Sequence, residues 1–336
     1  MKVGNGLVAG RRLHVGVLSK LKSPPVRCLR RVSTTAALGP SDPHAYCREF
    51  VRKRDYDSFL NSYFYPRHAQ NGYFAIKAFS VELATVQDSV SNAMIGKMRM
   101  QFWRDAVKGI SDVRVLTILF GRPPKHPIAL ALYDASPKAK SAFTYHLKRI
   151  IDAREAELHT SSYLTVDTLA SHAESTSSTV LYLLLSLLSL PSSSLSHAAS
   201  HLGTAQTFST LLRALPFHVK QGRLVIPAEI TAKHGVVQED VFRQGPNAHG
   251  IEDAVFEFAT IANDQLATAR NMVVATDDAN GRVPREAMPI FIAGVPVSNY
   301  LQRLEKAGFD AFNPKLQRRD GLIAWQMWWA SYKRRF

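Results

Sequence analysis

The sequence predicts an all-α protein organised as one large domain. Apolar residues recur at helical spacing through most of the chain, whereas the two-residue alternation typical of half-buried strands is scarce. A chain of 336 residues with 46% hydrophobic content can bury a large core. Proline and glycine clusters separate the helical stretches, and no loop reads as a long low-complexity linker. We therefore expect a single helical domain over residues 42–336.

Residues 1–41 differ from the rest of the chain in charge. They contain eight Lys and Arg residues and no acid, and Ser33, Thr34 and Thr35 follow the last arginine. Subtracting these eight from the net charge of +15 leaves +7 for the remainder, an ordinary basic surface. An Arg-rich, acid-free start predicts a disordered mitochondrial transit peptide. A basic arm that binds nucleic acid or anionic lipid is the alternative, but no aromatic-interleaved basic patch follows, so nucleic acid is not expected as a partner.

Helices are predicted in order along the domain, and proline or glycine separates most of them. The predicted spans are residues 46–64, 71–90, 94–109, 128–135, 139–158, 165–190, 251–275 and 321–333, with a further helix that starts at Leu202. The apolar run at 180–190 is shorter than the ~20 residues that cross a bilayer, so it predicts a buried helix end before Pro191.

The helix predicted over residues 71–90 has a single apolar stripe. Its members recur at alternating steps of three and four residues: Ile76, Phe79, Leu83, Val86 and Val90. Ala84 and Asp88 sit beside this stripe, one helical turn apart.

The helix predicted from Leu202 has two distinct faces. Its core-facing set is Phe208, Leu211, Leu212 and Leu215, and the other face carries Thr207, Thr210, Ala214 and His218. Pro216 is expected to kink or end this helix. The loop GRLVIP (residues 222–227) follows and is too short for a sheet.

Two further residue types are weighed as chemical groups. Cys47 is the one cysteine outside residues 1–41, and a lone thiol forms neither a disulfide within the domain nor a cysteine metal site. His197 and His201 have a spacing that can serve zinc, but no third ligand is near them in sequence. We therefore expect no metal site, and solvent-facing histidines instead.

Several of these stretches resemble the squalene/phytoene synthase family of head-to-head prenyl transferases. The resemblance is carried by NGYFAIKAFSVELATVQDSV (71–90), GKMRMQFWRDAV (96–107), LKRIIDAREAEL (147–158) and LGTAQTFSTLLRALPFHVKQGRLVIP (202–227). It implies the all-helical isoprenoid synthase fold with a central cavity. In that family, acids three or four residues apart on two helices hold Mg²⁺ against a diphosphate.

In the first of these regions the resemblance implies a depleted centre. The basic residue that meets diphosphate in the family falls on Val81, and the first acid falls on Ala84. The acid four residues later is kept as Asp88. Asp88 is therefore either a remnant metal ligand or, since one carboxylate cannot hold Mg²⁺ alone, a hydrogen-bonded or solvated side chain.

In the second region the same comparison finds two more acids replaced. The family's Gln and Asn fall on Thr207 and Thr210, and its metal-binding acids fall on Ala214 and His218, while Arg213 is retained. Arg213 is either an anion contact in the old cavity or part of an ion pair that packs helices. His218 has no partner identifiable from sequence, so a structural role is favoured over acid or base chemistry. The resemblance thus implies a pseudoenzyme with no catalytic residue, metal or cofactor.

One branch of this family has a centre depleted in this way and is required for assembly of mitochondrial respiratory complex I. HAESTSSTVLYLLLSLL (172–188), residues 197–227 and LEKAGFDAFNPKLQ (304–317) resemble it. The resemblance implies a protein on the matrix side of the inner membrane, attached peripherally, whose partners are complex I subunits or other assembly factors. Two alternatives remain: a prenyl transferase acting on isoprenoid diphosphates, and a carrier whose cavity, widened at Ala84 and Ala214, binds a lipid or isoprenoid.

The last predicted helix carries an aromatic stripe. Trp325, Trp328, Trp329 and Tyr332 follow the spacing of one helix face, and three basic residues come directly after them. An aromatic stripe with a basic end suits a helix at a lipid interface or against a partner protein. The alternative is a helix packed on the core with a solvated basic tail.

Overall fold

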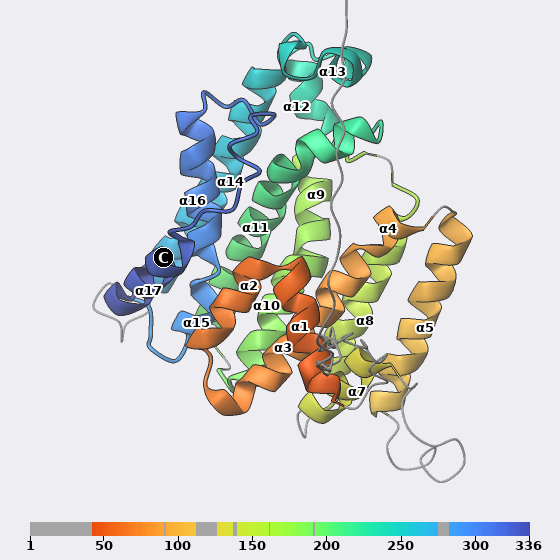
Figure 1. Ribbon diagram of the computed structural model, residues 1–336, viewed down its shortest axis with the longest axis vertical. Coiled ribbons are helices and arrows are strands. Elements are labelled where there is room, and N and C mark those ends of the chain that lie inside the picture. The colour runs from red at the N-terminus through yellow and green to blue at the C-terminus, as the bar shows by residue number, and fades with distance from the viewer. Residues whose placement is uncertain are drawn as a thin grey trace, which may run out of the picture. The chain divides into compact units, whose positions relative to one another are not determined.

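The computed structural model describes residues 42–90, 92–111, 126–136, 140–160, 162–190, 192–274 and 282–336. Every regular element in these residues is helical, and the predicted all-α class is therefore confirmed (Figure 1). The described residues belong to one compact unit. The predicted transit peptide, residues 1–41, lies outside the described residues.

The first group of helices comes from the N-terminal half of the unit. Its members are α1 (Pro43–Arg54), α2 (Tyr56–Asn61), α3 (Arg67–Ala84), α4 (Val86–Ser89), α5 (Ala93–Ser111), α7 (Pro127–Ala135) and α8 (Lys140–Glu157). Within it α3 packs against α1 and α7, and α5 packs along α8. Local chemistry sets the start of α1, because the Asp42 carboxylate accepts a hydrogen bond from the His44 N–H and Pro43 occupies the first helical position.

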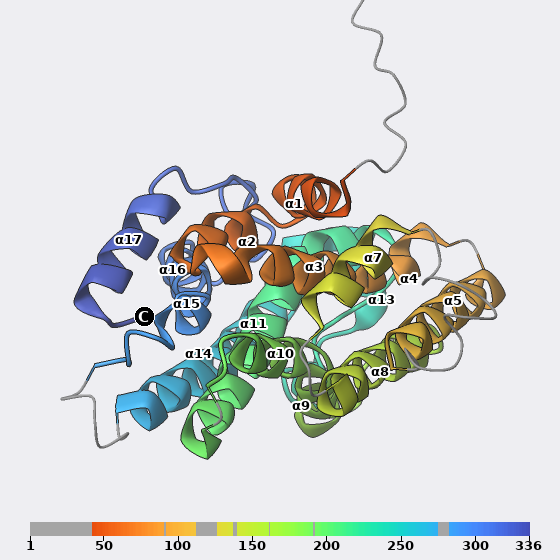
Figure 2. The same ribbon diagram turned by 90° about the horizontal axis from the view of Figure 1, so that it is seen from below.

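The second group is built around two long helices. Its members are α9 (Val166–Ala173), α10 (Thr179–Leu187), α11 (Ser193–Lys220), α12 (Ala228–Lys233), α13 (Gln238–Gln244), α14 (Ile251–Val274), α15 (Met288–Phe291), α16 (Gly294–Lys306) and α17 (Ile323–Lys333). α11 and α14 lie side by side (Figure 2). α10 packs against α3 and α8 of the first group and against α11 of the second, so it joins the two groups.

The predicted apolar stripe of α3 faces the core. Ile76, Phe79 and Leu83 are at most 1% exposed, and Val86 in α4 is fully buried. On α11 Phe208, Leu212 and Leu215 are likewise buried. Burying these residues gives the two helices that carry the candidate site a stable base, at roughly 2 kcal/mol for each large apolar side chain.

A π-helical turn, Glu174–Ser178, interrupts the helix predicted over residues 165–190. It lies against α11 at Gly203, where an added Cβ would come within 2.5 Å of the Ser178 backbone nitrogen. The Ser178 hydroxyl donates to the Ser200 carbonyl at 2.9 Å, which ties the turn to the same stretch of α11. Gly203 therefore permits a backbone approach that no other residue allows.

Some predicted boundaries were wrong. The helix expected over residues 46–64 is divided at Asp55, whose carboxylate caps α2 by accepting from the Ser58 N–H. Pro216 does not end its helix, since α11 runs on to Lys220. A proline costs one intrahelical hydrogen bond, and the buried Leu215 and Val219 on either side of it keep α11 packed.

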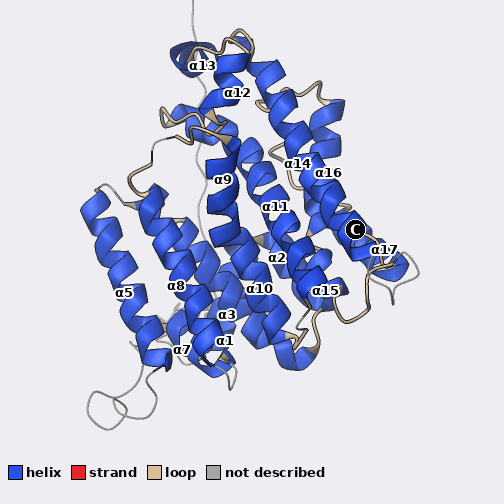
Figure 3. Cartoon of the chain, turned by 180° about the vertical axis from the view of Figure 1, so that it is seen from behind, coloured by secondary structure: helices blue, strands red, loops and turns tan. Residues whose placement is uncertain are grey.

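Four helices were not predicted at all: α12, α13, α15 and α16 (Figure 3). The first three have seven residues or fewer, too short to show a helical period. α16 is longer and buries Val297, Leu301 and Leu304 at helical spacing, a signal that the sequence did contain.

Candidate functional site

Residues 71–90, the first of the two regions that resemble the family's metal-binding motifs, do not form one continuous helix. α3 ends at Ala84, Thr85 is a turn residue, and Asp88 lies in the four-residue α4. Val81 and Ala84 are half-buried. The surviving carboxylate is therefore carried on a separate short turn beyond the end of α3.

The Asp88 carboxylate binds Arg223, the arginine of the GRLVIP loop. Nη2 of Arg223 lies 2.6 Å from Oδ1 of Asp88, and it also donates to Oε1 of Gln221 at 2.9 Å. The side chains of Arg223 and Asp88 are 22% and 33% exposed, so the pair is partly shielded from water. A guanidinium thus neutralises the carboxylate that the resemblance singles out in this region.

His218 belongs to the same cluster. Its Nδ1 lies 3.1 Å from Nη2 of Arg223. Burial, together with the Arg223 charge, lowers the pKa of His218 below its usual value. At neutral pH the ring is therefore uncharged and Nδ1 accepts the hydrogen bond. The structure thus joins Asp88 and His218, one from each of the two regions that resemble the family's motifs, through Arg223.

The other predicted positions of the second region lie nearer the start of α11 than His218 does. The Thr207 hydroxyl is 2.8 Å from the Ser177 hydroxyl of the π-helical turn. Nη1 of Arg213 is 3.4 Å from Oδ2 of Asp57, with both side chains more than a third exposed. Burial raises the pKa of Asp57, and the charge of Arg213 opposes that rise.

Two adjoining cavities remain beside Arg213. The smaller, about 180 Å³, has Lys77 and Ser80 of α3 on one side and Gln206 and Thr210 of α11 on another. The larger, about 370 Å³, is lined by Ala214 and by cations that include Arg213, Arg303, Arg318 and Arg319. Val81 and Ala84 line neither of these two cavities. Of the predicted cavity positions, Thr210, Arg213 and Ala214 thus line these two cavities, and the larger one has four arginines and two acids, Asp57 and Asp320.

Arg154, Glu157 and His172 form a largely buried charge cluster that was not predicted from the sequence. Nη1 of Arg154 lies 2.7 Å from Oε2 of Glu157, and Nε2 of His172 lies 3.8 Å from the same oxygen. Burial raises the pKa of Glu157, but Arg154 and His172 lower it more, so the carboxylate stays charged. Burial lowers the pKa of His172 to about 4. The i, i+3 spacing of Arg154 and Glu157 is the feature of the sequence that could have predicted this ion pair.

Glu157 also contacts the region that carries Asp88, through its backbone carbonyl. Nε2 of Gln87 in α4 donates to the backbone carbonyl of Glu157 at 2.9 Å. The turn that carries Asp88 is therefore held against the end of α8.

The described residues contain no group of three His, Cys, Asp or Glu side chains arranged to hold a metal ion. Cys47 is buried, and burial raises the pKa of its thiol to about 12, so it stays protonated at neutral pH. His201 is 2.7 Å from the Gln265 amide oxygen, and His197 is exposed. These groups therefore have ordinary structural partners or face solvent.

The aromatic stripe of α17 points outward. α17 packs through Ile323 and Met327, the two residues it buries. The exposed fractions along the stripe are 58% for Trp325, 53% for Trp328, 42% for Trp329 and 69% for Tyr332. Across the described ranges, no helix has the length and apolar character needed to cross a membrane.

Comparison with known sequences agrees with the resemblance found in the motifs. The family model for squalene/phytoene synthase matches residues 51–329. A rat protein named NADH dehydrogenase (ubiquinone) complex I, assembly factor 6 is 38% identical over 93% of this chain and 89% of its own. The human protein of the same name is 34% identical over 97% of this chain and 93% of its own. A homolog from Dictyostelium discoideum is 26% identical over 79% of this chain.

Solved structures agree in fold. A dehydrosqualene synthase in complex with ligand superposes with a TM-score of 0.67 at 18% identity, covering 86% of this chain and 95% of that one. The squalene synthase HpnC from Alicyclobacillus acidocaldarius gives a TM-score of 0.65 at 14% identity, covering 80% and 95%. At these identities the likeness speaks for the fold alone.

Proposed function

The chain belongs to the squalene/phytoene synthase family, and from this premise we propose that it is a non-catalytic member that acts in the assembly of mitochondrial respiratory complex I. Its partners are complex I subunits or other assembly factors, at the matrix face of the inner membrane. The name shared by the rat and human relatives, which align with more than nine tenths of this chain, supports this role.

The Asp88–Arg223 ion pair is the observation that carries the non-catalytic part of the proposal. Mg²⁺ takes about six oxygen ligands, and on proteins carboxylates supply the charged ones. Here Ala84 and Ala214 have no ligand atom, and the one retained carboxylate, Asp88, already binds a guanidinium at 2.6 Å. A cation approaching Asp88 meets the positive charge of Arg223, so this cluster disfavours Mg²⁺.

Purified protein is therefore expected to release no diphosphate from farnesyl or geranylgeranyl diphosphate with Mg²⁺ present. The test is a phosphate-coupled assay with product analysis, run beside Arg223→Met, which frees Asp88. Mg²⁺-dependent turnover by the wild type would reject the non-catalytic proposal and favour a prenyl transferase with an altered metal site.

Non-covalent binding of a lipid or isoprenoid is a second candidate, compatible with the first. The 370 Å³ cavity beside Ala214 has the size of a small-molecule site, and its arginines suit an anionic head group. Native mass spectrometry of the purified protein tests this candidate. A bound lipid that is lost in Ala214→Trp supports it, and protein that is empty after gentle purification from its own cells rejects it.

The mitochondrial location includes a proposal about residues 1–41. We infer that they direct import and are then removed, which leaves residues 42–336 as the working domain. Import into isolated mitochondria checks this directly: the full chain is expected to be imported and shortened, and a chain lacking residues 2–41 is expected to stay outside. Equal import of both forms would count against it.

A further inference from the structure

The aromatic residues of α17 form a continuous exposed surface. The Trp325 and Trp329 rings stack at 5.9 Å, as do the Trp328 and Tyr332 rings, and Trp329 also stacks on Tyr332 at 5.8 Å. Leu322, at the start of the helix, is 64% exposed. Because α17 is anchored by the opposite face, through Ile323 and Met327, this surface has no partner among the described residues.

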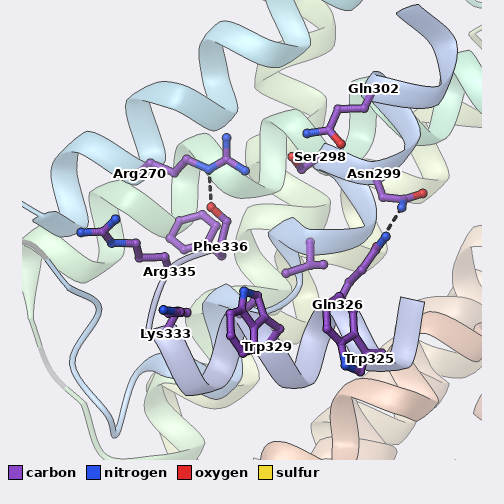
Figure 4. A pocket seen from close by; sticks show the side chains of 12 residues that line it. Arg270, Ser298, Asn299, Gln302, Trp325, Gln326, Trp329, Lys333, Arg335 and Phe336 are labelled. Carbon is purple, nitrogen blue, oxygen red and sulfur yellow. Dashed lines mark hydrogen bonds between the residues drawn. The ribbon is translucent and has the colours of Figure 1, made fainter. Parts of the chain in front are cut away.

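A pocket of about 560 Å³ borders this surface, between α17, α16 and α14. Figure 4 shows Arg270, Lys333 and Arg335 at one end of it and the amides of Asn299 and Gln302 toward the other. The Arg270 Nε donates to the carbonyl oxygen of Phe336, which holds the cationic end in place.

The cations at this end are not paired with acids. Lys333, Arg334 and Arg335 make no ion pair with a carboxylate of the described residues, and α17 itself contains no acid. Lys333 lies 4.9 Å from the Trp329 ring centre. The nearest preceding acid, Asp320, is already bonded to Asn299 and to the Leu322 N–H. The surface therefore combines exposed indoles with positive charge that no side-chain carboxylate of the described residues pairs with.

This combination matches the surface of a bilayer that contains anionic phospholipid. Tryptophan and tyrosine favour the interfacial zone, where the ring is buried and its polar atom stays hydrated. Lysine and arginine beside them gain from the negative surface potential. A protein partner would have to supply its own acids opposite Lys333 and Arg335, whereas an anionic bilayer presents phosphates everywhere.

We propose that α17 docks on an anionic bilayer, with Trp325, Trp328, Trp329 and Tyr332 in the interfacial zone and a lipid phosphate in the pocket beside Arg270, Lys333 and Arg335. This inference rests on the proposed membrane association and gives it a site. It requires no helix that spans the bilayer.

The tryptophan content makes a direct test possible. The chain has four tryptophans, three of them on α17, and the fourth, Trp103, is 2% exposed. Full-length protein is titrated with vesicles of phosphatidylcholine alone or with a third phosphatidylglycerol. The expected result is a blue shift of tryptophan emission and co-flotation with the anionic vesicles, weakened by salt as surface electrostatics is.

Two variants locate the binding. Lys333→Ala with Arg335→Ala is expected to lower the affinity by about twenty-five-fold, since each cation near an anionic surface contributes about fivefold. Trp325→Ala with Trp328→Ala is expected to lower it by about tenfold or more on both vesicle types, because apolar area is lost. The matched controls, Lys97→Ala with Lys148→Ala and Tyr63→Ala with Tyr145→Ala, remove exposed side chains from other helices and are expected to bind as the wild type does.

Wild-type protein that fails to bind anionic vesicles, or variants that all bind as well as it does, would overturn the inference. Fractionation of mitochondria separates that failure from failure of the proposed function. A protein that pellets with inner membranes but does not bind vesicles is held there by another protein, so its membrane association stands while this site falls. The charge variant keeps the test valid even if loss of two tryptophans disturbs folding.

Discussion

Asp88 and Arg223 are 135 residues apart in sequence and meet in a single ion pair. Asp88 could be singled out from sequence, because the family resemblance places one of the family's acids at its position. Its partner could not, since the position of Arg223 depends on how the loop after α11 packs in three dimensions. For the same reason Arg213 was identified but its contact with Asp57 was not.

The Asp88–Arg223 pair is expected to contribute little to stability. Asp88→Asn should lower the free energy of unfolding by about 1 kcal/mol or less, because the pair is partly hydrated. Glu157→Gln is the matched comparison and should cost about 3 kcal/mol, since it leaves Arg154 buried without its carboxylate. Urea denaturation of both variants measures the difference. Equal losses of unfolding free energy would show that the difference in burial between the two ion pairs does not change their contribution to stability.

His172 is expected to make stability depend on pH. Its pKa is about 4 in the folded protein against 6.5 when unfolded, so the unfolded chain takes up the proton first as the pH falls. Stability is then complete above pH 6.5 and decreases progressively between pH 6.5 and 4, by about 3 kcal/mol at most.

His172→Gln should flatten this dependence between pH 7 and 5, as measured by the urea midpoint. Part of the slope should remain, because burial also lowers the pKa of His126, His146 and His218. Glu157 affects stability at lower pH. Because its pKa is lowered in the folded protein, it stabilises the fold above pH 4.5, and this contribution is lost as the pH falls further. A variant with the same slope as the wild type would show that His172 is not the group responsible.

At the scale of elements, the long helices other than α16 were predicted, whereas the short helices α12, α13 and α15 were not. The stripes of α3 and α11 repeat several times, so each gives a local signal that survives in isolation. The π-helical turn at Glu174–Ser178 gives no such local signal, because its feature is a tertiary contact, the close packing against α11 at Gly203. α12 and α13 are too short to show a period.

Gly203→Ala tests that close approach. The added Cβ would lie 2.5 Å from the Ser178 nitrogen, so either the π-helical turn or α11 must move. We expect a loss of about 3 kcal/mol or more in the free energy of unfolding, within the range for overpacking a rigid site. Gly321→Ala is the control, since an added Cβ there meets no atom within 4 Å. A Gly203→Ala protein as stable as this control would contradict the packing described.

For the molecule as a whole, the fold is shared with synthases although few residues are identical. The helical arrangement matches synthases at TM-scores of 0.65 and 0.67 with 14% and 18% identity, because many different apolar side chains can fill the same core. The metal centre tolerates no such exchange, since it depends on particular carboxylates. Periodicity could therefore predict the all-α class, and the synthase-like fold was predicted only through the family resemblance, while the contacts of Arg223 could not be predicted from either.

The most direct test of the proposed role is native gel electrophoresis of mitochondria from cells that lack this protein. The cells are complemented with the wild type or with Asp88→Asn combined with Arg223→Met, which removes the charged pair at the old metal position. We predict that complex I alone is lost and that both versions restore it. Normal complex I in the deletion, or rescue by the wild type alone, would contradict a non-catalytic role in complex I assembly.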